Sequence, residues 1–300
     1  MFARLARARP FGLLERVFLG RVDARVYALL RVGLALLLLV RQSDVLAPWL
    51  PLEHHRWVHG LDFSWSTAEE PHLVSPLVPG LALGATACTV LVYARTALAC
   101  GLLVGVRSRW CAAGLALVSY WLMFSDRFQY LHHLHLLFWS IAWLSLAPLD
   151  ARFSLEARLR GAAPLPSAPA WPLLLLRALV MSVYLAAGLA KLRPGWLSGE
   201  TLQILEILGM LRGAAWQALR DTLGYATIAW AIAMAELALP LLLAWRVTRR
   251  AAVYCAWALH LGVSASMNVS SFGAEMAWLL LAFLPRVTPP GPAEEARNSH

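Results

Sequence analysis

The chain is poor in charge. Only 14% of its 300 residues are Asp, Glu, Lys or Arg, whereas soluble domains carry about 25%. Hydrophobic residues make up 60% of the sequence and the mean hydropathy is +0.61, which excludes a disordered chain and a water-soluble globular domain. The net charge of +9 would suggest nucleic-acid binding in a soluble protein. Here the basic residues stand between apolar runs, so they report membrane topology and we expect no nucleic-acid partner.

Cysteine and lysine are the scarce residue types. The four cysteines lie in or beside apolar runs, with no CxxC pair and no zinc-type spacing, so we interpret them as small buried hydrophobic residues. Of the 26 basic residues, 25 are Arg, and Lys191 is the single lysine. An arginine stays protonated, whereas a partly buried lysine can lose its proton and act as a base. Lys191 is therefore either a candidate base or a snorkelling charge at the end of a helix.

Eight apolar runs predict an all-α integral membrane protein with about eight transmembrane helices. The runs cover residues 26–40, 81–106, 110–124, 131–147, 171–192, 225–245, 251–267 and 272–284. Stretches 11–19 and 151–160 are short and amphipathic, and 198–221 has helical periodicity with several charges. These three stretches predict short helices that lie in the membrane interface.

An even number of spans places both termini on one side of the membrane. That side carries 16 Lys and Arg residues and the opposite side carries 7, a bias that predicts cytoplasmic termini. We therefore expect an interfacial segment at 1–25, a transmembrane domain at 26–285 and a cytoplasmic tail at 286–300. The surroundings would be the lipid bilayer of a bacterial inner membrane. The long loops 41–80 and 193–223 would face outward.

A histidine cluster opens the fourth run. It contains Tyr130, His132, His133 and His135, with His132 and His135 three residues apart on one helix face. Loop 41–80 adds four histidines on the same side, His54, His55, His59 and His72. Acid–base chemistry, metal ligation and interfacial imidazoles bonded to loops are the alternatives. A membrane di-iron site needs more carboxylate and histidine ligands than this cluster supplies, so we expect no metal.

Ionisable residues also fall inside the runs. Those that we expect to form a buried charge network are Arg31, Arg95, Arg177, Glu236 and His260. Such groups are costly in lipid and usually face the interior of a bundle or a cavity. We predict that Glu236 pairs with one of the three arginines, either as a structural ion pair or as part of a proton path.

Two sequence segments resemble motifs of a known family. The segment HHLHL at 132–136 follows an aromatic-rich run, and GLAKLRPGWLSG at 188–199 ends the fifth run. In this order they resemble the HTTM family, which is the membrane domain shared with the vitamin K-dependent γ-carboxylases. The carboxylase base matches Lys191 and the family histidine matches His133. Ala190 and His132 stand where the carboxylases have a lysine and an asparagine.

The resemblance implies an outward-facing pocket for a reduced quinone similar to vitamin K hydroquinone, with quinol-linked oxidation or carboxylation-type chemistry of a lyase. Lys191 would deprotonate the quinol and His133 would be its acid–base partner. The residues expected to contact the substrate, which could include a peptide, are His132, His135, Tyr130 and Trp196. Whether the chain is an enzyme stays open at this point. The alternative is a non-catalytic membrane partner or maturation factor for an exported peptide.

Overall fold

A computed structural model describes residues 18–41, 85–125, 132–267 and 272–288 of the chain. These residues are mostly helical, which confirms the all-α expectation apart from one small two-stranded sheet. The chain divides into two compact units. The N-terminal unit comprises Met1–Leu174 and Val287–His300, and the C-terminal unit comprises Leu175–Arg286.

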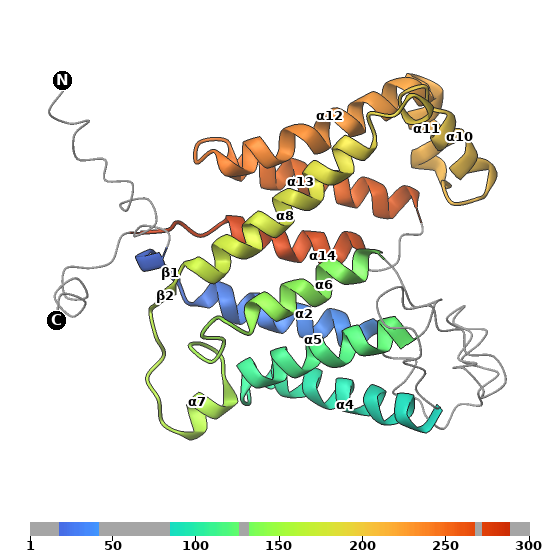
Figure 1. Ribbon diagram of the computed structural model, residues 1–300. Coiled ribbons are helices and arrows are strands. Elements are labelled where there is room, and N and C mark those ends of the chain that lie inside the picture. The colour runs from blue at the N-terminus through green and yellow to red at the C-terminus, as the bar shows by residue number, and fades with distance from the viewer. Residues whose placement is uncertain (1–17, 42–84, 126–131, 268–271, 289–300) are drawn as a thin grey trace, which may run out of the picture. The chain divides into compact units, whose positions relative to one another are not determined.

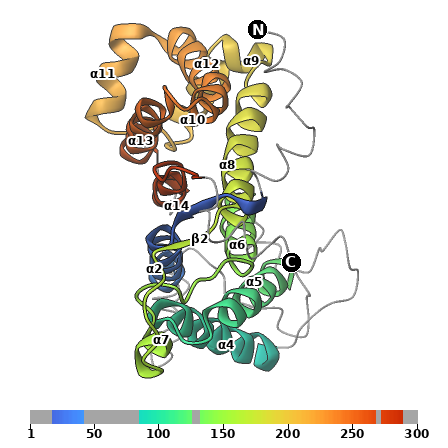
Figure 2. The same ribbon diagram turned by 90° about the vertical axis from the view of Figure 1, so that its left-hand side faces the viewer.

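The N-terminal unit contains a four-helix bundle. Its helices are α2 (Arg25–Arg41), α4 (Ala85–Val104), α5 (Ser108–Ser125) and α6 (His132–Leu144). Helix α4 packs against α2 and α5, and α6 packs against α5 and α2 (Figures 1 and 2). Leu30, Leu34 and Leu38 recur every four residues on α2 and are fully buried, because this spacing keeps them on one helix face.

A short sheet closes one end of the N-terminal unit. Strand β1 (Arg21–Asp23) pairs antiparallel with β2 (Ser167–Pro169), and Arg21 also bridges Thr288. We did not predict these strands, since three residues are too few to show the alternation that identifies a strand. Between α6 and β2 lies the short helix α7 (Leu155–Leu159), whose N-cap Ser154 accepts a hydrogen bond from the Ala157 backbone N–H.

The C-terminal unit is entirely helical in its described residues. Its elements are α8 (Trp171–Ala190, which begins in the N-terminal unit), α9 (Pro194–Leu197), α10 (Glu200–Ile207), α11 (Ala214–Leu223), α12 (Tyr225–Ala244), α13 (Arg249–Ser266), α14 (Phe272–Leu279) and the 3₁₀ helix η3 (Leu280–Phe283). Helix α13 packs against both α12 and α14. Pro172 in the first turn of α8 and Gly224, with a φ of 75° directly before α12, mark where these two helices begin.

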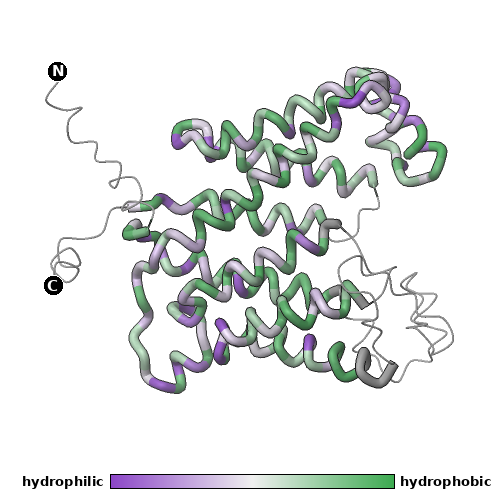
Figure 3. Tube along the Cα trace, in the orientation of Figure 1, coloured by the Kyte–Doolittle hydropathy of each residue, from purple (hydrophilic) through white to green (hydrophobic). Residues whose placement is uncertain are grey.

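Two described helices, α8 and α12, are long and apolar enough to cross a membrane. Each has 20 residues, which at 1.5 Å per residue gives about 30 Å, the thickness of the hydrocarbon core. Only 33% of each apolar window is buried within the chain, so apolar surface is left for lipid. Figure 3 shows hydrophobic residues along both helices and hydrophilic residues at the turn between α12 and α13.

The six other predicted spans coincide with described helices, but these helices are shorter or less apolar. For example, α6 has 13 residues and would reach about 20 Å. Their crossing of the membrane therefore stays a prediction. Of the expected interfacial helices, 151–160 contains α7, and 198–221 contains α10 and most of α11. The stretch 11–19 lies outside the described residues except for its last two, which are helical.

Candidate functional site

Lys191 and Glu236 meet directly. Lys191 is the first residue after α8, and its backbone N–H still donates to the carbonyl of Ala187. Its ammonium Nζ lies 2.6 Å from Glu236 Oε2 of α12. The Lys191 side chain is 20% exposed and that of Glu236 is 15% exposed. Both charges are therefore mostly shielded from the surroundings, but a small part of each side chain stays accessible.

An aromatic face completes the surroundings of the amine. The Lys191 Nζ lies 5.1 Å from the centroid of the Trp196 ring, a distance at which a cation is attracted by the π electrons. The indole N–H of Trp196 donates to the Ala229 carbonyl at 3.1 Å. Trp196 is thereby held against α12 with its ring turned towards Lys191. The family resemblance had assigned Trp196 a substrate contact, and its position beside the amine is compatible with that role.

Gly188 allows α8 to approach α12 closely enough for this pair. A Cβ at Gly188 would lie 2.8 Å from Leu237 Cγ and 3.0 Å from the Leu237 backbone nitrogen. These distances are shorter than normal van der Waals contacts, so any side chain at Gly188 would push the two helices apart. Because Leu237 is adjacent to Glu236, the same displacement would separate Glu236 from Lys191.

The pair lies well inside the length of α12. Glu236 is the twelfth residue of this helix, about 16 Å along the axis from its first residue. From Lys191 the chain runs beside the first three turns of α12, where Trp196 meets Ala229 and Gly199 packs against Tyr225 and Ala226. If α12 crosses the bilayer over its whole length, the amine and the carboxylate lie below the membrane surface.

A compact cluster supports this site from the side of α10 and α11. Its buried members are Leu202, Leu211, Trp216, Ile228 and Ala229, and Trp196 packs against them. Beside it, the Glu206 carboxylate accepts a hydrogen bond from Tyr225 at 2.8 Å and pairs with Arg220. Partial desolvation alone would raise the pKa of the Glu206 carboxyl, but the hydrogen bond and the positive charge prevail and lower it. We did not predict this Glu206 network, because Glu206 and Arg220 are 14 residues apart on separate helices.

The histidine cluster is only partly described. Helix α6 begins at His132, but the side chains of His132 and His133, and the whole of Tyr130, lie outside the described residues. The His135 ring lies 5.6 Å from that of Tyr120 and 6.1 Å from that of Phe124, measured between centroids. The expected approach of His133 to Lys191 therefore remains a prediction. Among the described residues no three His, Cys, Asp or Glu side chains come together as a metal site, and the four loop histidines lie outside them.

The prediction that an arginine pairs with Glu236 is wrong, because Lys191 takes that place. The sequence could not show which helix packs against Glu236. Arg177 instead donates to the backbone oxygens of Ala282 and Pro285, at 2.8 and 2.7 Å. Arg95 is partly buried on α4. The expected network thus resolves into separate groups of contacts.

Arg31 is held by a dense set of oxygen atoms in the N-terminal unit. It is fully buried and donates to Ser108 Oγ at 3.2 Å and to the Phe153 carbonyl at 2.7 Å. Asp150 Oδ1 lies 3.9 Å from its Nη1. Gly105, with a φ of +80°, leaves the space for this guanidinium, and a Cβ there would collide with it. These contacts assign Arg31 a structural role at the corner between α4 and α5.

His260 and Tyr184 form a second buried polar pair. Tyr184 Oη lies 2.7 Å from His260 Nε2, and the Phe272 ring meets the imidazole edge-on at 5.6 Å. The other imidazole nitrogen, Nδ1, is buried without a hydrogen-bond partner among the described residues. Tyr184 lies on α8 seven residues, or about two helical turns, before Lys191.

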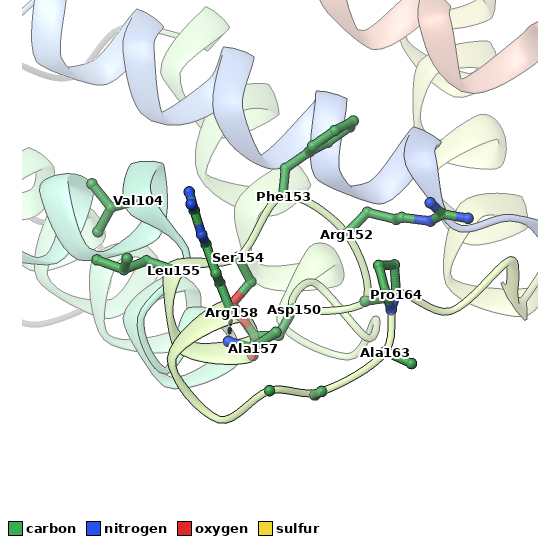
Figure 4. A pocket seen from close by; sticks show the side chains of 13 residues that line it. Val104, Asp150, Arg152, Phe153, Ser154, Leu155, Ala157, Arg158, Ala163 and Pro164 are labelled. Carbon is green, nitrogen blue, oxygen red and sulfur yellow. Dashed lines mark hydrogen bonds between the residues drawn. The ribbon is translucent and has the colours of Figure 1, made fainter.

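A pocket of about 730 Å³ lies in the N-terminal unit between Val104 and the loop 150–164 (Figure 4). Asp150, Arg152 and Arg158 are its charged lining residues. Figure 4 shows the Arg152 and Arg158 side chains pointing in different directions. They do not converge on one point, so they do not build an anion site. None of the residues predicted from the sequence as site residues lines this pocket.

The fold defines the class of protein: a helical protein with at least two helices suited to crossing a membrane and a Lys–Glu pair between them. Residues 22–287 match the HTTM domain family, so the chain belongs to this family. The family supports a membrane protein. No curated protein and no solved structure gave a significant match.

Proposed function

We propose that Lys191 acts as a base towards a reduced quinone, or a similar amphipathic aromatic molecule with an acidic hydroxyl, in an outward-facing site of an eight-span membrane protein. The observation that carries this proposal is the 2.6 Å contact between Lys191 Nζ and Glu236 Oε2. Two further observations support the proposal. Lys191 is the single lysine of the chain, and its segment resembles the carboxylase motif.

Glu236 can accept a proton from the Lys191 ammonium and so convert it into a neutral amine, which is a base. Two opposite charges in a low-dielectric site both lose hydration, and proton transfer within the pair removes both charges. The transfer breaks one N–H bond of Lys191 and forms an O–H bond on Glu236 Oε2. It leaves a neutral amine with a free electron pair, which then accepts the proton of the ligand hydroxyl.

The surroundings of the amine fit such a ligand. Trp196 offers a flat aromatic face next to the amine, on which another ring can stack. A bound quinol would supply the ionisable hydroxyl, and oxygen-dependent oxidation of the ionised ring is the chemistry that the resemblance implies. His133 keeps its proposed role as the acid–base partner, with His132, His135 and Tyr130 as ligand contacts. A peptide substrate and carboxylation-type chemistry are part of the same proposal.

In the proposed topology, six further helices cross the membrane in addition to α8 and α12, which gives eight spans. These are α2, α4, α5, α6, α8, α12, α13 and α14 with η3, and the distribution of basic residues supports cytoplasmic termini in a bacterial inner membrane. A reporter enzyme fused after Arg297 should be active in the cytoplasm. Activity on the opposite side would contradict this topology.

The test is oxidation of vitamin K hydroquinone by the protein in lipid nanodiscs under oxygen, with empty nanodiscs as the background. We expect the wild type to oxidise it faster than the background. Lys191→Arg should abolish the excess rate, because arginine keeps the charge but does not release its proton. The matched control is Arg193→Gln, an exposed residue two positions away, which should keep the wild-type rate.

Two outcomes would contradict the proposal. A wild type no faster than empty nanodiscs would favour the non-catalytic alternative, in which the Lys191–Glu236 ion pair only joins α8 to α12. A Lys191→Arg variant as fast as the wild type would remove Lys191 from the reaction. The temperature of unfolding of each variant, measured in the same nanodiscs, separates loss of activity from loss of folding.

A further inference from the structure

The segment between α8 and α12 exposes large apolar side chains away from both helices. Helices α10 and α11 form a hairpin, residues 200–223, whose tip is Ile207–Met210. Ile207 is 83% exposed, Leu208 66% and Met210 46%, and Ile204 on the same side of α10 is 48% exposed. Exposed apolar residues in such a group need a partner surface.

The hairpin uses other residues for its own packing. Leu202, Leu211 and Trp216 face inward and join Ile228 and Ala229 of α12 in the buried cluster. Two charged groups of the hairpin are engaged inward, since Glu206 pairs with Arg220 and accepts a hydrogen bond from Tyr225. The hairpin therefore packs against the rest of the unit through these other residues. The apolar side chains of the tip are not needed for that packing.

Both ends of the hairpin are attached at helix ends. Its first helix starts level with the first residue of α12, since Gly199 packs against Tyr225 and Ala226. On the return side, Leu211 bridges Met267, and the Arg212 backbone N–H donates to the Ser266 carbonyl at 2.9 Å, at the end of α13. Along the chain the tip lies between these two attachments, one at the start of α12 and the other at the end of α13.

A cationic residue flanks the apolar tip. Arg212 is exposed, and no carboxylate of the described residues pairs with its guanidinium. The tip itself, Ile-Leu-Gly-Met, has no charge. An apolar group next to an unpaired cation is the arrangement that binds the boundary between acyl chains and phosphate headgroups.

We propose that the tip Ile207–Met210, together with Ile204, inserts into the headgroup–acyl boundary of the membrane that holds α12. The partner is the bilayer itself, with the apolar side chains in the acyl region and Arg212 at the phosphates. Trp196 packs against the base of the same hairpin and lies over Lys191. Insertion of the tip therefore fixes the depth of the Lys191 site. The proposal stands on packing and exposure, and does not depend on the reaction at Lys191.

The test measures the environment of the tip in nanodiscs. A fluorescent nitrobenzoxadiazole group is attached to Ile207→Cys in a chain whose four native cysteines are replaced by alanine. The matched control is Gln217→Cys on α11, an exposed position on the same helix face as Asp221. We expect blue-shifted emission at position 207, quenched at least twofold more strongly by lipids with a nitroxide near the headgroup than at the chain end. The label at position 217 should show water-like emission and little quenching.

Three results would overturn the proposal. One is water-like emission at position 207, equal to that at position 217. Another is equal quenching by shallow and deep nitroxides. The third is a blue shift that needs two copies of the chain per nanodisc and shows no lipid quenching, which would assign the tip to self-association. Lys191→Arg in the same background should leave the quenching unchanged, which separates this proposal from the proposed reaction.

A second measurement covers the case in which the cysteine-free chain does not fold. A photoreactive benzophenone amino acid replaces Ile207 in the chain with its native cysteines, and the products of illumination are weighed by mass spectrometry. Phospholipid adducts are the expected result. Adducts to a second polypeptide without lipid adducts would contradict membrane insertion.

Discussion

Arg31 and Lys191 are both cations withdrawn from water, but their surroundings differ. Arg31 is fully buried and donates to three oxygen atoms from two segments, the start of α5 and the loop that contains Leu149 and Phe153. Lys191 has one carboxylate at 2.6 Å, one carbonyl at the long distance of 3.5 Å and an aromatic face. Many fixed acceptors hold a charge permanently, whereas a single titratable partner can take the proton. The contacts of Arg31 stabilise the N-terminal unit, whereas the single charged partner of Lys191 is the arrangement on which the proposed reaction rests.

Removal of the Arg31 guanidinium should have the largest effect on stability. Arg31→Met leaves the oxygen atoms around it without their donor, and we expect the free energy of unfolding to fall by about 3 kcal/mol. Thermal unfolding in detergent measures this loss. Arg25→Met, at an exposed position on the same helix, is the matched control and should change stability by less than about 0.5 kcal/mol. Equal effects of the two substitutions would show that the contacts of Arg31 do not stabilise the N-terminal unit.

Gly188→Ala should have the next-largest effect on the free energy of unfolding, because it changes the contact between α8 and α12. The added Cβ meets Leu237, and overpacking of this kind costs about 2 kcal/mol. Gly262→Ala on α13 is the control, since a Cβ there meets nothing within 4 Å and alanine is the better helix former. Unfolding measurements should therefore show opposite signs for the two glycines. A neutral Gly188→Ala would mean that the close approach of α8 and α12 is not needed.

Glu236→Gln should cost about 2 kcal/mol, because it keeps the shape of the side chain but leaves Lys191 without a counter-charge. The double variant with Lys191→Met should be more stable than the sum of the two single losses predicts, since the two residues contact each other. Strict additivity in unfolding experiments would show that the pair contributes no interaction energy.

The smallest expected effect is the pH dependence that comes from Glu206. Its pKa is lower in the folded chain than the ordinary glutamate value of 4.5, so the unfolded chain binds the proton more tightly. The stabilisation is complete above the ordinary value and is lost as the pH falls through the lowered one. Glu206→Gln should flatten this part of the profile of melting temperature against pH. An identical acid limb in both proteins would contradict the role of Glu206.

Local sequence signals predicted the helices well. The starts of α8 at Trp171 and α12 at Tyr225 agree with the prediction to the residue, because Pro172 and Gly224 act within one turn of the chain. The strands β1 and β2 were missed, since each is defined by its partner about 145 residues away. Their pairing left no pattern within three residues.

The site could be predicted only in part. Lys191 could be recognised because the chain has no other lysine, and the composition of the sequence shows this without any structure. Its partner was assigned to an arginine, because pairing depends on which helices touch, and the glycine that lets α8 approach α12 was not recognised as a contact. Glu206 carried no signal at all, since Tyr225 and Arg220 reach it from different helices.

The single lysine offers the most direct measurement. Protein grown with ζ-¹⁵N lysine has one labelled side-chain amine, so its nuclear magnetic resonance signal belongs to Lys191 without further assignment. The signal is recorded in nanodiscs under argon while vitamin K hydroquinone is added. We predict a saturable shift of the Lys191 signal that Glu236→Gln alters and Arg193→Gln does not. A signal that stays unchanged at saturating quinol, in a protein shown to be folded, would contradict Lys191 as the proton acceptor.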